Sequence, residues 1–338
     1  MGSPAIVRTS AARYNHAAMI QLKQLTVPDV VQSPMANCTD LPFRLIARRH
    51  GMRFAFLEML SAEALVRRTR GSDDRMDTAP EDRPVGAQLV GCDPAVMGEA
   101  AAQLEARGFD LIDLNLGCPV PKIVSNGGGS QLLREPTLAE QIFTRVVRAV
   151  TRVPVTVKMR LGYSDGSGAE AARIARIAQD CGVDAVAVHG RTRAQGYAGV
   201  ADYEAIRRVK EAVSIPVFGN GDVVDGDSAV RLKQVSGCDG VMLGRGALGN
   251  PWIYRRVEAS LRAEPAPPPP TWAERKAVVL EHLELQCRYE RDPVGPLRRI
   301  LCWYYREVPG AAQFRDLVHR AQTVEEMRQL VEQYFPTE

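Results

Sequence analysis

Eight short segments rich in Val, Ile and Leu alternate with helix-like segments, and this alternation constrains the fold more than any other feature. The apolar segments span residues 29–35, 54–59, 84–91, 110–118, 154–162, 184–191, 215–222 and 239–246. Their nearly continuous apolar character is typical of strands buried on both faces of a parallel sheet. Helical patterns occupy residues 94–107, 138–151, 169–181 and 202–212 between them, and several end at a Gly before the next strand.

Eight strand–helix units predict an α/β protein with a (β/α)8 TIM barrel. An open, doubly wound sheet is the alternative, but that fold expects a GxGxxG turn after its first strand. The sequence has no such turn there. We therefore favour the barrel.

The repeating pattern stops at "RAEPAPPPPTW" (262–272), where four consecutive prolines predict a stiff, extended spacer. We expect a barrel at 25–261, a Pro-rich linker at 262–271 and a helical domain at 272–338. Residues 1–28 contain no Asp or Glu. For residues 1–24 we favour an unstructured N-terminal tail over a transit peptide.

Composition places the chain among soluble globular proteins, with 45% hydrophobic and 25% charged residues and a net charge of +3. No apolar run reaches membrane-spanning length, and no secretory signal opens the chain. Seven cysteines form no CxxC pair and no zinc-ligand spacing. We therefore expect a cytoplasmic protein with free thiols, no membrane association and no metal.

Polar side chains recur at the carboxyl end of nearly every predicted strand, which is where TIM barrels place their active sites. A single such residue has an ordinary structural explanation, but their convergence on one rim indicates a binding site. The set comprises Ser33, Pro34, Met35, Glu58, Gln88, Asn115, Cys118, Lys158, Arg160, His189, Arg191, Asn220, Gly221, Asp222, Gly244, Arg245 and Gly246.

The ligand predicted from this set is a phosphorylated heterocycle. Glycine-rich turns after the seventh and eighth strands, together with Arg245, suit a phosphate. The amide groups of Gln88 and Asn115 and the ammonium of Lys158 suit a flat ring. Flavin mononucleotide (FMN) has both parts, and Lys158 would stabilise the negative charge on its reduced ring.

Cys118 is a candidate proton donor. An unperturbed thiol, with a pKa of about 8.5, is mostly protonated at neutral pH and can protonate the carbon next to one that accepts a hydride. A lysine or arginine nearby would instead favour the thiolate, and a buried cysteine can simply fill space. The glycines at 127–129 either let the loop close over a substrate, which we favour, or bind phosphate.

The sequence resembles the tRNA-dihydrouridine synthases, in particular a bacterial branch, over residues 25–335. The matching motifs are "SPMANCTDLPFR" (33–44), "QLVG" (88–91), "DLNLGCPVPKIVSNGGGSQLL" (113–133), "VTVKMRLG" (155–162), "VAVHGRTRAQGY" (186–197), "VFGNGDV" (217–223) and "GCDGVMLGRGALGNPWIY" (237–254). The resemblance implies an FMN barrel and a helical domain that binds tRNA. NADPH would reduce the flavin, which then reduces a uridine, typically in the D-loop, to 5,6-dihydrouridine.

The resemblance also implies roles for individual residues. Cys118 would protonate C5 while the flavin delivers hydride to C6, and the side chains of Asn115, Arg191 and Arg193 would face the uridine or the RNA. The expected cofactor contacts are Ser33, Pro34, Met35, Gln88, Lys158, His189, Asn220, Gly221, Asp222, Gly244 and Arg245. One departure occurs in "LRRILCWYY" (297–305), where Arg299 and Ile300 replace a lysine and a histidine of the family motif.

Two other functions fit parts of this pattern. An FMN barrel oxidoreductase acting on a free pyrimidine, such as dihydroorotate, would use the same chemistry. The helical domain and the rim arginines (67, 68, 70, 191 and 193) favour a large polyanion instead. A tRNA-binding module without catalysis would not need the thiol, lysine and histidine that the strand ends carry.

Overall fold

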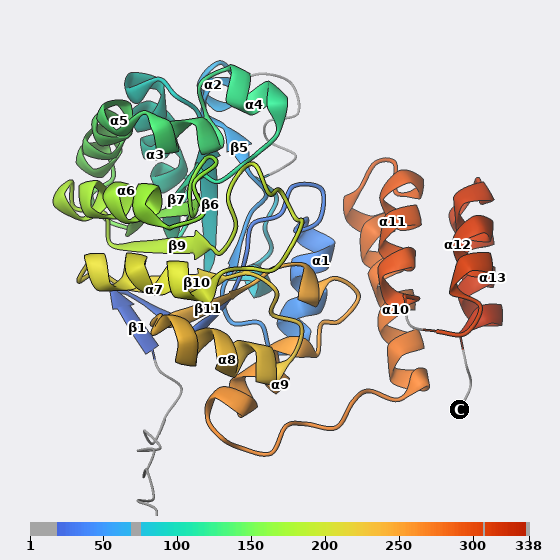
Figure 1. Cartoon of the computed structure of the whole chain (residues 1–338). Coiled ribbons are helices and arrows are strands. Elements are labelled where there is room, and N and C mark those ends of the chain that lie inside the picture. The colour runs from blue at the N-terminus through green and yellow to red at the C-terminus, as the bar shows by residue number, and fades with distance from the viewer. Residues whose placement is uncertain (1–18, 69–75, 307, 336–338) are drawn as a thin grey trace, which may run out of the picture.

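A parallel eight-stranded barrel forms the larger part of the molecule (Figure 1). The computed structural model describes residues 19–68, 76–306 and 308–335. The barrel strands are β3 (Val30–Gln32), β4 (Ala55–Phe56), β6 (Val85–Val90), β7 (Leu111–Leu116), β8 (Val155–Arg160), β9 (Ala185–His189), β10 (Val217–Asn220) and β11 (Gly240–Leu243). Each falls within one of the eight predicted segments, so the predicted TIM barrel is confirmed.

The strand order around the barrel is β3-β11-β10-β9-β8-β7-β6-β4, and the short strand β5 (Leu60–Ser61) also pairs with β6. The N–H of Gln32 donates to the carbonyl of Phe54 at 3.0 Å, which joins the first and last strands of this order. The barrel residues of β6 and β10 are buried throughout. This burial explains why their sequences lack the polar alternation of a solvent-exposed sheet.

Helices surround the barrel between successive strands (Figure 1). Several begin at the residue types that cap helices, as at Asp93 and Asp202, whose carboxylates accept N–H groups of the first turn. The helices are α1 (Leu41–Arg49), α2 (Ala62–Val66), α3 (Pro94–Ala106), α4 (Pro121–Ser125), α5 (Pro136–Ala149), α6 (Ala169–Asp180), α7 (Tyr203–Ala212), α8 (Gly226–Ser236) and α9 (Ile253–Leu261).

An antiparallel hairpin of β1 (Met19–Leu22) and β2 (Leu25–Pro28) closes the amino-terminal end of the barrel. Its buried side chains Ile20, Leu22 and Val27 share a cluster with interior residues of the barrel, among them Leu111 and Phe218. Residues 19–22 fall within the segment we predicted to be a tail, and they form a strand because these apolar side chains cover the barrel floor. Residues 1–18 of that segment lie outside the described residues.

Four further helices follow an extended segment that includes the four prolines and lie beside the barrel (Figure 1). They are α10 (Trp272–Tyr289), α11 (Val294–Tyr304), α12 (Ala311–Arg320) and α13 (Val324–Tyr334). Helix α10 is capped by Thr271, which forms a capping box with Glu274. Side-chain contacts join α10 to the barrel, because Gln286 donates to Asp40 at 2.7 Å and Arg49 pairs with Glu281.

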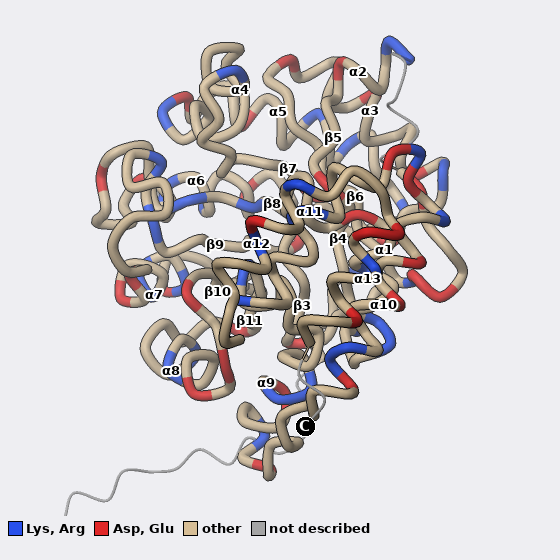
Figure 2. Tube along the Cα trace, turned by 90° about the vertical axis from the view of Figure 1, so that its right-hand side faces the viewer, with Lys and Arg blue, Asp and Glu red and all other residues tan. Residues whose placement is uncertain are grey.

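Lys and Arg are interspersed with Asp and Glu over the side that carries these four helices, as Figure 2 shows. In the described part of the chain, no helix is both long and apolar enough to cross a membrane.

Candidate active site

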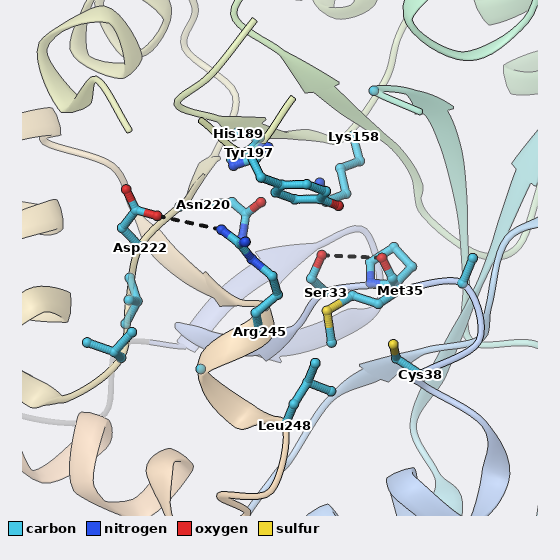
Figure 3. A pocket seen from close by; sticks show the side chains of 18 of the residues that line it. Ser33, Met35, Cys38, Lys158, His189, Tyr197, Asn220, Asp222, Arg245 and Leu248 are labelled. Carbon is cyan, nitrogen blue, oxygen red and sulfur yellow. Dashed lines mark hydrogen bonds and ion pairs between the residues drawn. The ribbon is translucent and has the colours of Figure 1, made fainter. Parts of the chain in front are cut away.

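A cavity of about 800 Å³ opens at the carboxyl ends of the barrel strands (Figure 3). Thirteen of the fifteen predicted site residues line it: Ser33, Pro34, Met35, Gln88, Asn115, Cys118, Lys158, His189, Asn220, Gly221, Asp222, Gly244 and Arg245. Parallel pairing explains their convergence, since the register sets Asn115 beside Lys158 and Asn220 beside His189. Among the described residues, no group of three or more His, Cys, Asp and Glu could hold a metal ion.

Lys158 is a partly buried cation of this cavity. Burial and then the charge of Arg160 lower its pKa to about 8, although the carboxyl group of Asp113 acts in the opposite direction. Its side chain points into the cavity near Tyr197 (Figure 3). The ammonium therefore predominates at neutral pH and is lost readily above pH 8.

His189 lies at the end of β9 and is only 7% exposed. Burial, followed by the positive charges of Lys158 and Arg160, lowers its pKa to about 2. The imidazole is therefore neutral at physiological pH. It can donate or accept a hydrogen bond in the cavity, but it cannot supply a positive charge there.

Cys118 lies in the loop that follows β7 and is partly buried. The side-chain oxygen of Asn115 accepts the N–H groups of Gly117 and Cys118 at 3.0 and 2.8 Å, which anchors this loop. Burial raises the pKa of the Cys118 thiol, although Arg160 and Lys158 act in the opposite direction. Desolvation thus outweighs the nearby cations, and the thiol stays protonated at neutral pH.

The glycine-rich segment after Cys118 packs against it. Gly129 has a positive φ of 59°, and a Cβ there would lie 2.8 Å from the carbonyl oxygen of Cys118. The N–H of Ser130 donates to the same oxygen at 3.1 Å. The close approach of these two backbone segments requires glycine at position 129.

Arg245 supplies a partly exposed positive charge at the turn after β11. Its guanidinium lies over the ring of Tyr197, 4.3 Å from the ring centroid, and 3.9 Å from the carboxylate of Asp222 (Figure 3). The neighbouring turn after β10 depends on Gly221, whose φ is +135° and where a Cβ would lie 2.7 Å from the Cβ of Ala201. The turns after β10 and β11 thus place the Gly221 backbone and the Arg245 guanidinium in the lining of the cavity.

Of the fifteen residues given a role, Arg191 and Arg193 do not line the cavity, and neither does Glu58 of the wider strand-end set. Both terminal nitrogens of Arg191 donate to the carboxylate of Asp222 at 2.8 Å, and the side chain also donates to two loop carbonyls. Arg193 lies over the ring of Tyr163, 5.0 Å from its centroid. Contact of either arginine with a substrate stays a prediction. Of the other rim arginines, Arg67 and Arg68 are exposed, whereas Arg70 lies outside the described residues.

Several cavity residues were not assigned to the site from sequence. Tyr197 comes from the loop after β9, is 60% exposed and lies 5.5 Å from the guanidinium of Arg160. Cys38 lies in the loop before α1, and burial raises its pKa to about 11. The helical segment beyond the linker contributes Arg275, Trp303, Tyr304 and Arg306.

The dihydrouridine synthase (Dus) family model matches residues 31–338. A tRNA-dihydrouridine synthase B of Xanthomonas campestris pv. campestris is 42% identical over 310 residues, covering 91% of this chain and 93% of that protein. A Pseudomonas aeruginosa protein of the same name is 38% identical and covers 94% of this chain and 96% of its own. The chain belongs to the dihydrouridine synthase family.

Solved structures with the same barrel are more distant. Histamine dehydrogenase from Rhizobium sp. 4-9 superposes with a TM-score of 0.57 at 13% identity, covering 80% of this chain and 50% of that one. A 2-naphthoyl-CoA reductase gives a TM-score of 0.53 at 10% identity, covering 71% of this chain and 51% of that one. This dihydrouridine synthase family member thus shares its fold with parts of longer enzymes.

Residues 299 and 300, where the resemblance implied a lysine and a histidine, lie on α11. Ile300 is 1% exposed and belongs to the hydrophobic core. Arg299 lies over the ring of Trp303, 5.6 Å from its centroid, and Trp303 lines the cavity. The side chain at position 300 therefore serves packing, while the positive charge at position 299 stays beside the cavity wall.

Proposed function

We propose that this enzyme reduces a uridine of tRNA to 5,6-dihydrouridine, with FMN bound in the barrel cavity and Cys118 as the proton donor. The observation that supports this most directly is a protonated, partly buried thiol in the same cavity as Lys158 and Arg245. The substrate follows from the relatives, whose names describe synthesis of dihydrouridine in tRNA.

The cavity suits FMN in size and in donor chemistry. Its volume of about 800 Å³ lies within the range typical of cofactor sites. Lys158 and the amide of Gln88 would face the pyrimidine side of the ring. Arg245 and the glycine turns at 221 and 244 would hold the phosphate, because charge and exposed backbone are what an anion requires.

FMN, when bound and reduced by NADPH, would supply the hydride that C6 of the uridine accepts. Cys118 supplies the proton: its S–H bond breaks as the C5–H bond forms, and the thiolate then regains a proton from solvent. The N–H bonds to Asn115 hold the loop, and therefore the sulfur, in place during this transfer. Neutral His189 adds no competing acid, because its pKa of about 2 keeps it unprotonated.

The walls of the cavity favour a polynucleotide substrate over a free pyrimidine. Residues from the segment after the linker (Arg275, Trp303, Tyr304 and Arg306) close one side of the cavity with cations and aromatic rings. We assign α10–α13 to tRNA binding, residues 25–261 to catalysis and residues 262–271 to the linker between them. A D-loop uridine that swings out of its stack would enter between the two parts.

Two measurements test this proposal: whether the purified protein carries a flavin, and which substrate it reduces. The purified protein is expected to be yellow and, with NADPH, to add two hydrogens to transcribed tRNA at a D-loop uridine, as mass spectrometry of nuclease fragments would show. Free uracil and dihydroorotate, assayed for turnover under the same conditions, are the controls. A colourless protein that cannot bind FMN would contradict the proposed cofactor. Turnover of a free pyrimidine without turnover of tRNA would favour the alternative, an oxidoreductase acting on a free pyrimidine.

We place the reaction in the cytoplasm, where seven free cysteines persist.

A further inference from the structure

A buried carboxylate lies beneath the cavity floor, in the middle of β7. Asp113 is 1% exposed, and its neighbours in the sheet register are Gln88 on β6 and Thr156 on β8. Thr156 Oγ1 donates to Asp113 Oδ1 at 2.6 Å, and Gln88 Nε2 donates to Asp113 Oδ2 at 2.6 Å. Two donors from neighbouring strands therefore satisfy this carboxylate.

The hydrogen-bond chain continues upward from Gln88 to the loop of Cys118. Asn115 Nδ2 donates to Gln88 Oε1 at 2.7 Å, and Asn115 Oδ1 accepts the N–H groups of Gly117 and Cys118. Asp113 is thus joined to the Cys118 backbone through two side-chain amides. Gln88, Asn115 and Cys118 all line the cavity, whereas Asp113 does not.

The two ends of this chain determine its direction. The carboxylate of Asp113 only accepts hydrogen bonds, and the backbone N–H groups at the other end only donate them. Between these ends, the nitrogen of Gln88 must face Asp113 and its oxygen must face Asn115. The nitrogen of Asn115 must then face Gln88, which leaves its oxygen for the N–H of Cys118.

We propose that Asp113 is a positioning residue, which acts through Gln88 and Asn115 to orient the amide that faces the cofactor and to hold the loop that carries Cys118. The effect of Asp113 on catalysis rests on the proposed function, whereas its effect on the position of the Cys118 loop does not. Asp113 does not line the cavity, so a change there reaches the loop of Cys118 through this chain. Its charge also acts on Lys158, whose pKa it raises, so the test must separate the hydrogen bond from the charge.

The substitution Asp113→Leu removes the acceptor at the lower end of the chain. Position 113 then no longer holds the Gln88 amide in one orientation, and Asn115 loses its fixed acceptor. The loop of Cys118 loses its anchor, and we expect iodoacetamide to alkylate Cys118 roughly tenfold faster in protein freed of flavin. Peptide mapping by mass spectrometry resolves each cysteine, and exposed Cys287 serves as the internal reference.

A second substitution at the same position keeps the acceptor. In Asp113→Asn, the amide oxygen can still accept from Gln88 and the amide nitrogen can donate to the hydroxyl of Thr156, so the Cys118 rate is expected to stay within about threefold of wild type. Both variants remove the charge of Asp113, so the difference between them reports the hydrogen bond. A further control is Asp184→Asn, because the carboxylate of Asp184 accepts the N–H of Val155 at 2.8 Å at the opposite end of the barrel. This control should leave the Cys118 rate unchanged.

An unchanged Cys118 rate in folded Asp113→Leu protein, or a rate in Asp113→Asn that rises as far as in Asp113→Leu, overturns the proposal. If Asp113→Leu does not fold, Asp113→Ala, which also lacks the acceptor, takes its place, and an unchanged Cys118 rate there overturns the proposal. The alkylation assay uses neither flavin nor tRNA, so its result is independent of whether the enzyme proves to reduce uridine. The flavin dissociation constant, measured by fluorescence, should also rise roughly tenfold in Asp113→Leu.

Discussion

At the scale of single residues, the balance between burial and charge determines what each group in the cavity can do. Burial raises the pKa of Cys118 and lowers those of Lys158 and His189, so the site holds a thiol, an ammonium and a neutral imidazole at pH 7. From sequence, the effect of nearby cations on the thiol could not be weighed against burial, because that comparison requires the distances and the solvent exposure.

Replacing Cys118 by Ala should remove the proton donor while leaving the cofactor site intact. We expect tRNA reduction to fall by roughly 10²- to 10⁴-fold, the range typical of general acid catalysis, with an unchanged flavin absorbance spectrum. Single-turnover reduction of tRNA by the prereduced protein measures this. The matched control is Cys38→Ala, a second thiol in the same cavity. A similar loss in both variants would contradict the assignment of Cys118.

The pH dependence of flavin binding should report on Lys158. The pKa of this lysine in the folded protein is about 8, below its ordinary value of 10.5, so its charge is present below pH 8 and is lost as the pH rises above it. The FMN dissociation constant should therefore rise roughly tenfold between pH 7 and pH 9.5, since a charged hydrogen bond is lost. Fluorescence titrations measure it. In Lys158→Met, FMN binding should be weaker and its dissociation constant should not change with pH over this interval. A pH dependence in this variant equal to that of the wild type would contradict the prediction.

At the scale of elements, the loop after β9 brings an aromatic ring over the cavity. The ring centroid of Tyr197 is 5.5 Å from the guanidinium of Arg160, 4.3 Å from that of Arg245 and 6.3 Å from the ring centroid of His189. An exposed aromatic ring at the mouth of the proposed active site is suited to stacking on a base.

We expect Tyr197→Ala to lower kcat/KM for tRNA roughly tenfold or more, because stacking on one base contributes about 1–3 kcal/mol. Tyr197→Phe should retain most of the activity, since it keeps the ring. Tyr163→Ala is the control, because this tyrosine also contacts arginines, Arg134 and Arg193, but does not line the cavity. Steady-state assays over a range of tRNA concentrations measure all three. An equal loss in the Tyr163 variant would show that the effect is not specific to the cavity.

The elements differ in how far the sequence predicts them. The barrel strands and their polar ends follow from periodicity, because parallel strands are apolar throughout and meet at one rim. Periodicity does not predict the β1–β2 hairpin, because its two strands are only four residues each and are buried by contact with the barrel floor. Tyr197 and the ion pair between Arg191 and Asp222 depend on how loops fold back, with 31 residues separating the two members of that pair.

At the scale of the whole molecule, the cavity depends on the contact between the barrel and the helices beyond the linker. Trp303 and Tyr304 of α11 line the cavity beside Leu248 and Gly249 from the barrel. Gly249 makes this contact possible: its φ is +72°, and a Cβ there would lie 2.4 Å from the backbone carbon and oxygen of Trp303. Backbone atoms cannot move aside as a flexible side chain does.

Gly249→Ala should therefore displace α11 from the barrel. We expect a loss of roughly 1–3 kcal/mol in the free energy of unfolding, as for other overpacked contacts, together with a higher KM for tRNA. Gly237→Ala is a matched control, because Gly237 also has a positive φ, +66°, but a Cβ there would meet nothing within 4 Å. That variant carries only the backbone strain, about 1 kcal/mol. Denaturant unfolding and tRNA kinetics on both proteins measure the difference. If the two variants match in stability and in KM, close packing at Gly249 does not hold the helical segment against the barrel, and the proposed tRNA binding does not depend on it.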